Sequence, residues 1–173
     1  MRAIAARAGI DLATLSAGAC VITGSNGKGS TAAMLASALS SAGKRTGLFT
    51  SPHLFEINER FRIDGADISD AALDRHWARL EEAADAWLAA HPGEALGGFE
   101  FLFLLAASWF SEAQCDGAIW EAGIGGRYDV TRLIHAPCAA LVSLDLEHTS
   151  LLGDTLEEIA KDKIDVVAPG GFV

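Results

Sequence analysis

The chain has 173 residues, half of them hydrophobic, and this length suffices for one domain with a sizeable core. Its formal net charge of −10 argues against nucleic acid or an anionic membrane as a partner, because both need a cationic face. No apolar stretch is long enough to span a bilayer, and the first residues lack a secretory signal pattern, so we expect a cytoplasmic protein.

Strand and helix patterns alternate along the chain. Strands are expected at 19–23, 45–50, 116–122 and 138–144, and a hairpin is expected at 61–63 and 66–68 around Asp64-Gly65. Helices are expected at 30–42, at 69–90 with Ser69 as N-cap, at 99–113, and from Asp154 to about 163. Strands separated by helices predict an α/β fold of P-loop type, with a mostly parallel sheet and helices on both faces.

Three cysteines, Cys20, Cys115 and Cys138, each fall in or beside an apolar run and show no CxxC spacing. We therefore expect small buried side chains in a reducing compartment.

The most informative segment joins the first strand to the first helix and reads GSNGKGST over residues 24–31. Glycines in such a turn let backbone N–H groups converge on an anion, and the helix points its positive end at it. Lys28 supplies positive charge for terminal phosphates, and the hydroxyls of Ser30 and Thr31 can reach Mg²⁺. An ordinary strand–helix connection is the alternative, since Gly29 occupies the usual hydroxyl position. The predicted nucleotide-binding residues are Gly24, Ser25, Asn26, Gly27, Lys28, Gly29, Ser30 and Thr31.

Polar residues follow three of the predicted strands. Ser51 comes after the second strand, Glu121 ends the third, and His148 follows the fourth. Ligands bind at the carboxyl ends of parallel strands, and we expect the strands before Glu121 and His148 to be neighbours. These side chains are suitable ligands for Mg²⁺ beside a phosphate. A surface histidine is the alternative for His148, whereas Glu121 is costly to bury without a cationic partner.

Several short motifs together resemble one known family. The turn at 24–30 is accompanied by TSPHL at 50–54, NER at 58–60, FE at 99–100, EAGIGGR at 121–127 and HT at 148–149. In this order they are similar to the folylpolyglutamate synthase and dihydrofolate synthase branch of the Mur ligase superfamily. The resemblance covers residues 19–170, and its TSPHL and EAGIGGR blocks are specific to this branch.

The resemblance implies an ATP-dependent amide ligase that joins L-glutamate to dihydropteroate, to folates, or to both. ATP would phosphorylate a pterin carboxylate, and the amino group of glutamate would attack the acyl phosphate. The implied cofactors are ATP and Mg²⁺. The implied residues are Lys28, Glu121, His148 and Lys163 for catalysis, Ser51, Glu121, His148 and carbamylated Lys163 for the metal, and Phe99, Glu100, Tyr128, Asp129 and Val130 for the pterin.

This chain departs from the family pattern mainly on the pterin side. Gly97-Gly98 replaces threonine and an aromatic residue, Val130 replaces alanine, and Glu147 replaces the aspartate before the metal histidine. Two alternatives to this folate-pathway function stay open. One is a related ligase acting on another carboxylate, and the other is a nucleotide-binding module without turnover. For Lys163 the alternative is a solvated lysine near a helix end.

The resemblance also implies a division of the chain. We expect residues 1–173 to be the N-terminal part of the ATP-binding domain, with Phe172-Val173 starting a further strand. The residues that hold adenine and ribose, and the C-terminal domain that brings glutamate, are not matched. We therefore expect these residues alone to be catalytically inactive.

Overall fold

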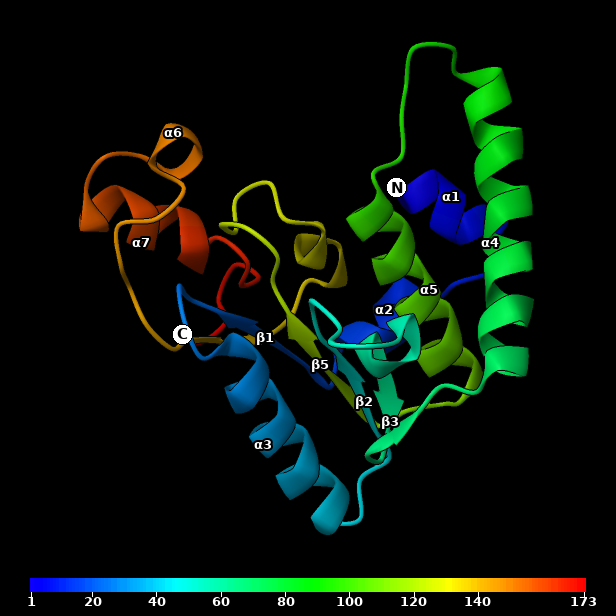
Figure 1. Cartoon of the computed structure of the whole chain (residues 1–173), viewed down its shortest axis with the longest axis horizontal. Helices are drawn as coiled ribbons and strands as arrows, with labels where there is room; N and C mark the ends of the chain where they lie inside the picture. Colours follow the sequence, from blue (N-terminus) through cyan, green and yellow to red (C-terminus); the bar gives the residue numbers. More distant parts are fainter.

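A computed structural model describes residues 1–173 as a six-stranded sheet in the order β4-β3-β2-β5-β1-β6 (Figure 1). Four strands are parallel: β1 (Ala19–Thr23), β2 (Thr46–Phe49), β5 (Gly117–Glu121) and β6 (Cys138–Leu141). The hairpin β3 (Phe61–Ile63) and β4 (Ala66–Asp67) continues the sheet in the antiparallel sense. The predicted α/β class with a mostly parallel sheet is confirmed.

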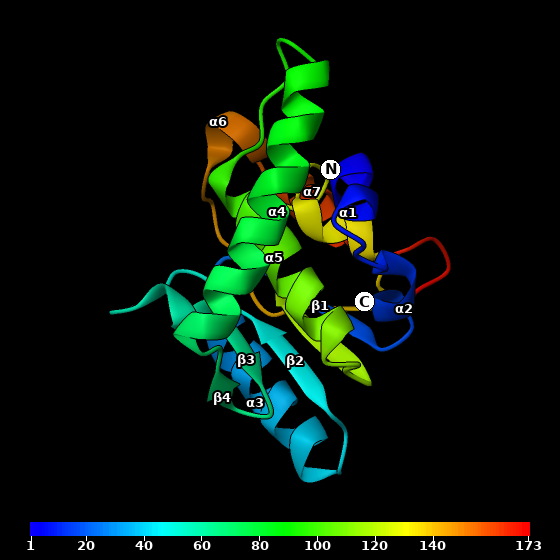
Figure 2. The same cartoon turned by 90° about the vertical axis from the view of Figure 1, so that its right-hand side faces the viewer.

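Helices cover both faces of the sheet. The helix α3 (Lys28–Ser41) packs on one face, and α5 (Gly98–Glu112) with α2 (Leu12–Ser16) packs on the other. Outside α5 lies α4 (Asp70–Ala90), which also contacts α1 (Arg2–Arg7) (Figure 2). A cluster of 30 buried hydrophobic residues fills the α5 side, whereas six such residues lie on the α3 side. Because α5 lies between the sheet and α4, most of its circumference is apolar.

Local signals in the sequence explain several element boundaries. The Ser69 hydroxyl accepts the N–H of Ala72 and caps α4, as expected. Asp64 and Gly65 have φ of +51° and +82°, the left-handed conformations that a tight hairpin turn requires. The helix α7 (Leu156–Ile164) is capped by Thr155 rather than Asp154, because Thr155 and Glu158 form the reciprocal capping box.

Short helical segments escaped prediction because so few residues carry no clear periodicity. They are α1, α2, η1 (Ile57–Arg60), η2 (Val130–Ile134) and α6 (Thr149–Leu152). The helix α3 begins at Lys28, two residues earlier than expected. None of the helices combines the length and apolarity that a bilayer-spanning segment needs.

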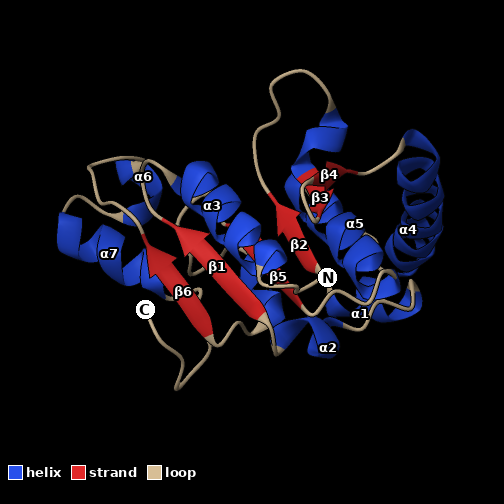
Figure 3. Ribbon diagram, turned by 90° about the horizontal axis from the view of Figure 1, so that it is seen from below, coloured by secondary structure: helices blue, strands red, loops and turns tan.

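At the β6 edge of the sheet, Phe172 forms a parallel bridge with Cys138, which agrees with the expected start of a further strand at Phe172-Val173. The helices α6 and α7 lie beyond β6 (Figure 3). Cys138 is exposed there, whereas Cys20 is buried and Cys115 is half-buried. The expectation of three buried cysteines is therefore wrong for Cys138, because its strand has only a single bridging residue on its outer side.

Candidate functional site

The turn after β1 has the backbone of a phosphate-binding loop. Gly24 has a φ of +142°, and a Cβ atom here would lie 2.8 Å from Val142 Cγ2. Gly27 has a φ of +80° and forms the N-cap of α3. The Nζ of Lys28 donates to the carbonyls of Gly24 and Ser25, at 2.7 and 3.3 Å. The turn is thus closed beneath the N-terminus of α3, and the first backbone N–H groups of a helix are the groups that bind an anion.

The segment after β6 holds this turn in place. The Ser143 hydroxyl accepts the Asn26 N–H at 2.7 Å and donates to the Asn26 carbonyl at 2.8 Å. The Ser143 carbonyl accepts the Ser25 N–H at 3.1 Å, and the Asp145 N–H donates to the Ser25 hydroxyl at 3.0 Å. Sequence analysis missed Ser143, since a single serine after a strand carries no recognisable signal.

A cavity of about 840 Å³ opens above the turn. Most of the predicted nucleotide-binding residues line it, together with Ser51 and Glu121, so three separate loops meet here. Of that predicted set, Gly24 and Thr31 are not on its wall. The lining residues are Ser25, Asn26, Gly27, Lys28, Gly29, Ser30, Ser51, Pro52, Arg60, Phe99, Glu121, Ala122, Gly123 and Ile124.

Glu121 is a buried carboxylate at the end of β5, only 5% exposed. Its Oε2 accepts the Ser51 N–H at 2.8 Å, because β2 and β5 are adjacent strands. Burial raises the pKa of Glu121, and the Ser51 N–H, Lys28 and Arg60 oppose that rise. Lys28 and Arg60 thus lower the cost of burying this acid by their charge, although neither forms an ion pair with it.

Arg60 is a lining residue to which sequence analysis gave no role. Its Nε donates to His53 Nδ1 at 2.8 Å. The NER block at 58–60 was the signal that pointed to this position.

His148 does not lie on the wall of this cavity. It is exposed, has a φ of +47°, and forms the N-cap of α6. The expectation that its strand neighbours that of Glu121 is wrong, because β1 lies between β5 and β6. No three His, Cys, Asp or Glu side chains gather as a metal-binding cluster anywhere in the chain.

Lys163 is only 2% exposed, so the alternative of a solvated lysine is wrong. Its Nζ lies 2.7 Å from Glu147 Oε1. Burial alone would raise the pKa of Glu147, but the neighbouring Lys163 and Ser25 lower it. Glu147, which stands where the family has aspartate, thus pairs with a lysine of α7.

A second cavity of about 330 Å³ shares Phe99 and Ile124 with the first. All five residues predicted to hold a pterin line it, whereas Gly97 does not. Its lining residues are Phe99, Glu100, Ile124, Tyr128, Asp129, Val130, Leu151, Leu152 and Asp162.

Two of the three acidic residues that line this second cavity, Glu100 and Asp129, bind backbone groups of its loops. The Glu100 carboxylate accepts the Gly97 N–H at 2.7 Å. The Asp129 carboxylate accepts the N–H groups of Gly123 and Thr131, and burial raises its pKa. Both carboxylates thus shape the loops that enclose the cavity.

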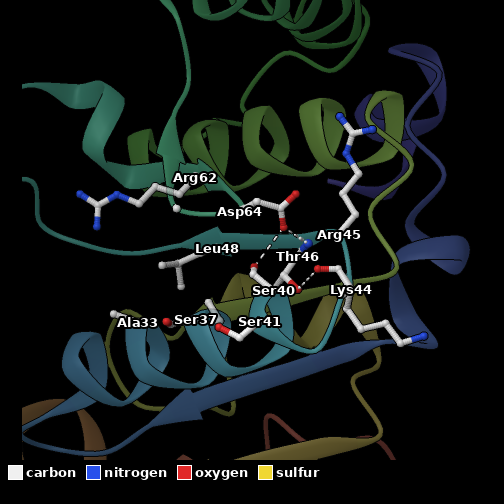
Figure 4. Close-up of a pocket in the computed structure, with 13 residues that line it drawn as sticks. Ala33, Ser37, Ser40, Ser41, Lys44, Arg45, Thr46, Leu48, Arg62 and Asp64 are labelled. Carbon is white, nitrogen blue, oxygen red and sulfur yellow. Dashed lines mark hydrogen bonds between the residues drawn. The ribbon is translucent and has the colours of Figure 1, made fainter.

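A third cavity, of about 790 Å³, lies at the opposite end of α3 (Figure 4). Asp64 accepts the Ser40 hydroxyl at 3.0 Å and the Thr46 N–H at 2.9 Å along its wall. It faces the amino end of β2, and none of the predicted site residues lines it. The carboxyl edge of the sheet is therefore the candidate site.

A glycine-rich turn at a helix N-terminus, beside a buried carboxylate at the carboxyl edge of a parallel sheet, defines a phosphate-binding α/β domain. No family model matches the chain. A mitochondrial folylpolyglutamate synthase from Cricetulus griseus is 44% identical over 154 residues, which are 86% of this chain and 26% of the relative.

Two solved structures are also similar. One is described as an FPGS–AMPPCP–folate complex, with a TM-score of 0.87 at 35% identity, covering 95% of this chain and 40% of that one. The other is a bifunctional folylpolyglutamate synthase/dihydrofolate synthase with Mn, AMPPNP and L-glutamate bound. Its TM-score is 0.81 at 34% identity, and the match covers 95% of this chain and 39% of that one.

Over the stretch that it spans, this chain belongs to the folylpolyglutamate synthase and dihydrofolate synthase family, as its motifs implied. It spans about a quarter of the length of the Cricetulus relative. Since that relative is described as mitochondrial, a cytoplasmic location stays a prediction.

Proposed function

We propose that this chain forms the phosphate- and pterin-binding part of an ATP-dependent ligase that adds L-glutamate to dihydropteroate, to folates, or to both. The supporting observation is that the two cavities share the walls formed by Phe99 and Ile124. A carboxylate on a pterin held in the smaller cavity would then lie near the terminal phosphate of a nucleotide on the turn. Such positioning is worth ~7–11 kcal/mol of the reaction barrier.

The phosphate-binding role rests on the turn and on the helix behind it. Backbone N–H groups at the start of α3 would bind the phosphate oxygens. Lys28, which donates to carbonyls of the turn, would redirect its ammonium group to the terminal phosphates. AMPPCP and AMPPNP in the two similar structures support this assignment.

The residues near the turn fit a magnesium ion. Mg²⁺ takes hard oxygen ligands, usually one or two carboxylates together with substrate phosphates and water. Ser30, Ser51 and Glu121 offer such oxygens on one cavity wall, so the absence of a cluster of several acids is compatible with this metal. When bound, Mg²⁺ would neutralise charge on the phosphates.

The two other implied metal ligands remain predictions. His148 lies outside the cavity wall and would have to approach it. Carbamylation of Lys163 would need a neutral amine that has released Glu147.

In the proposed reaction, a pterin carboxylate oxygen attacks the terminal phosphorus of ATP, and ADP leaves. The amino group of glutamate then attacks the carbonyl carbon of the acyl phosphate, and phosphate leaves together with the proton that the amine loses. Lys28 and the backbone N–H groups of the turn would stabilise charge on the transferred phosphoryl group. Phe99, Tyr128 and Val130 would hold and orient the pterin.

Calorimetric titration with ADP tests the assignment. We expect Mg²⁺ to strengthen ADP binding to the wild-type chain, and this gain to fall in Glu121→Gln. Glu82→Gln, at an exposed position on α4, is the matched control and should keep the full gain. The same gain in Glu121→Gln as in wild type would count against the metal assignment, and no binding of ADP or dihydropteroate to the wild-type chain would refute the function.

A further inference from the structure

Two cysteine thiols lie side by side outside the cavities described above. Cys20 on β1 and Cys138 on β6 are partners in the parallel register, and their Sγ atoms are 3.8 Å apart. Adjacent strands lie about 4.8 Å apart, within the roughly 4.4–6.8 Å between Cα atoms that a disulfide spans. Both thiols are free in the structure. The backbone therefore already holds them at a separation that a disulfide can bridge.

The two thiols differ in their access to solvent. Cys138 is exposed at the β6 edge, whereas Cys20 is buried among the residues beneath α3. Burial, together with the neighbouring Cys138, raises the pKa of Cys20 to about 12. Because the thiolate is the nucleophile and a buried thiol ionises less readily, the exposed Cys138 is the thiol that reacts first with an oxidant.

We propose that Cys20 and Cys138 form a dithiol that hydrogen peroxide converts into a reversible disulfide. First, the Cys138 sulfur attacks a peroxide oxygen and the O–O bond breaks. The products are a sulfenic acid on Cys138 and a hydroxide ion, which takes the Cys138 proton to become water. Next, the Cys20 sulfur attacks the Cys138 sulfur, the S–O bond breaks, and the departing hydroxide leaves as water with the Cys20 proton. Two thiols are oxidised, and one peroxide is reduced to two water molecules.

In a reducing compartment such a disulfide would be transient, which is the usual behaviour of a redox-sensing pair.

The disulfide can affect the phosphate-binding turn because both strands lead to it. The chain runs from Cys20 along β1 to Gly24 just past the strand end, and from Cys138 along β6 to Ser143, two residues past that strand, where Ser143 bonds Asn26. A disulfide bond is ~2.05 Å long, so the sulfur atoms must approach each other by roughly 1.8 Å. A closely packed sheet transmits such a displacement along its strands. On the basis of the proposed function, we expect the disulfide to weaken ADP binding severalfold.

Mass spectrometry of the peroxide-treated chain tests the dithiol. We expect the loss of two hydrogens, a linked peptide containing Cys20 and Cys138, and reversal by dithiothreitol. Cys20→Ser and Cys138→Ser should each abolish the link. Cys115, a half-buried thiol whose pKa burial raises to about 11, provides the control, and Cys115→Ser should leave the link intact. Accumulation of sulfinic acid on Cys138 with Cys20 still free would overturn the proposal.

Titration of the reduced and oxidised chain with ADP then tests the effect on the turn. A severalfold higher Kd in the oxidised form, restored by dithiothreitol, is expected. Equal affinity of the two forms would overturn this connection. If the reduced chain binds no ADP, the proposed nucleotide site fails, while the linked peptide still decides whether the dithiol exists.

Discussion

Replacing Ser143 by alanine should weaken nucleotide binding although Ser143 is not on the wall of the nucleotide cavity. The hydroxyl makes two hydrogen bonds with Asn26, one as acceptor at 2.7 Å and one as donor at 2.8 Å. Ser143→Ala removes both and leaves the Asn26 N–H and carbonyl to water. The turn must then be ordered by the nucleotide itself, and this cost appears as lower affinity.

The size of the effect follows from these two bonds. A hydrogen bond between neutral groups contributes about 0.5–1.5 kcal/mol net, so two contribute about 1–3 kcal/mol. Asn26 is exposed, so water replaces part of this contribution and the lower half of the range applies. A loss of about 1–2 kcal/mol corresponds to a roughly 5- to 30-fold rise in the Kd for ADP.

Calorimetric titration with ADP and Mg²⁺ measures this change. Ser143→Thr keeps the hydroxyl and should retain most of the affinity for ADP. If only the small volume of the Ser143 side chain mattered, the larger threonine would bind ADP worse than alanine does. Ser37→Ala, at an exposed position on α3, is the matched control and should bind ADP as wild type does. Wild-type affinity in Ser143→Ala would refute the reasoning.

Three further predictions concern two residues of the site and the loop that follows β2. Lys28→Ala should weaken ADP binding by about 1.5–3 kcal/mol, which is a roughly 10- to 150-fold rise in Kd, and should change the Tm by only a few degrees. A near-normal affinity for ADP would show that the Lys28 ammonium group does not contact phosphate. Val130→Ala should widen the smaller cavity and lower the Kd for dihydropteroate, measured by fluorescence titration, with ADP affinity as the internal control; an unchanged pterin Kd would remove Val130 from the pocket. The Glu59 carboxylate accepts the N–H groups of Leu54 and Phe55, which helps to lower its pKa to about 2. Because the folded-state pKa lies below the usual 4.5, this stabilisation is complete above pH 4.5 and is lost as the pH falls toward 2. The chemical shifts of the Leu54 and Phe55 amides should therefore change with a midpoint near pH 2. A midpoint near pH 4.5 would show that these two N–H groups do not stabilise the Glu59 carboxylate.

The sequence by itself determined the features that depend on contiguous residues. The glycine-rich turn before α3, the Asp64-Gly65 hairpin and the Ser69 cap follow from local backbone preferences and appeared where expected. The position of Glu121 at a strand end also followed from the apolar run before it. Motif resemblance further identified five residues that the structure places around one cavity.

Only the tertiary structure decided how these segments meet. The strand order places β5 between β2 and β1, which brings the Ser51 N–H to Glu121 and separates Glu121 from His148. The bonds from Ser143 to Asn26, the Glu147–Lys163 ion pair and the Cys20–Cys138 contact likewise join residues far apart in the chain. Local propensity carries no information on which strand lies beside which, because that choice depends on how all the helices and strands bury their apolar surface together.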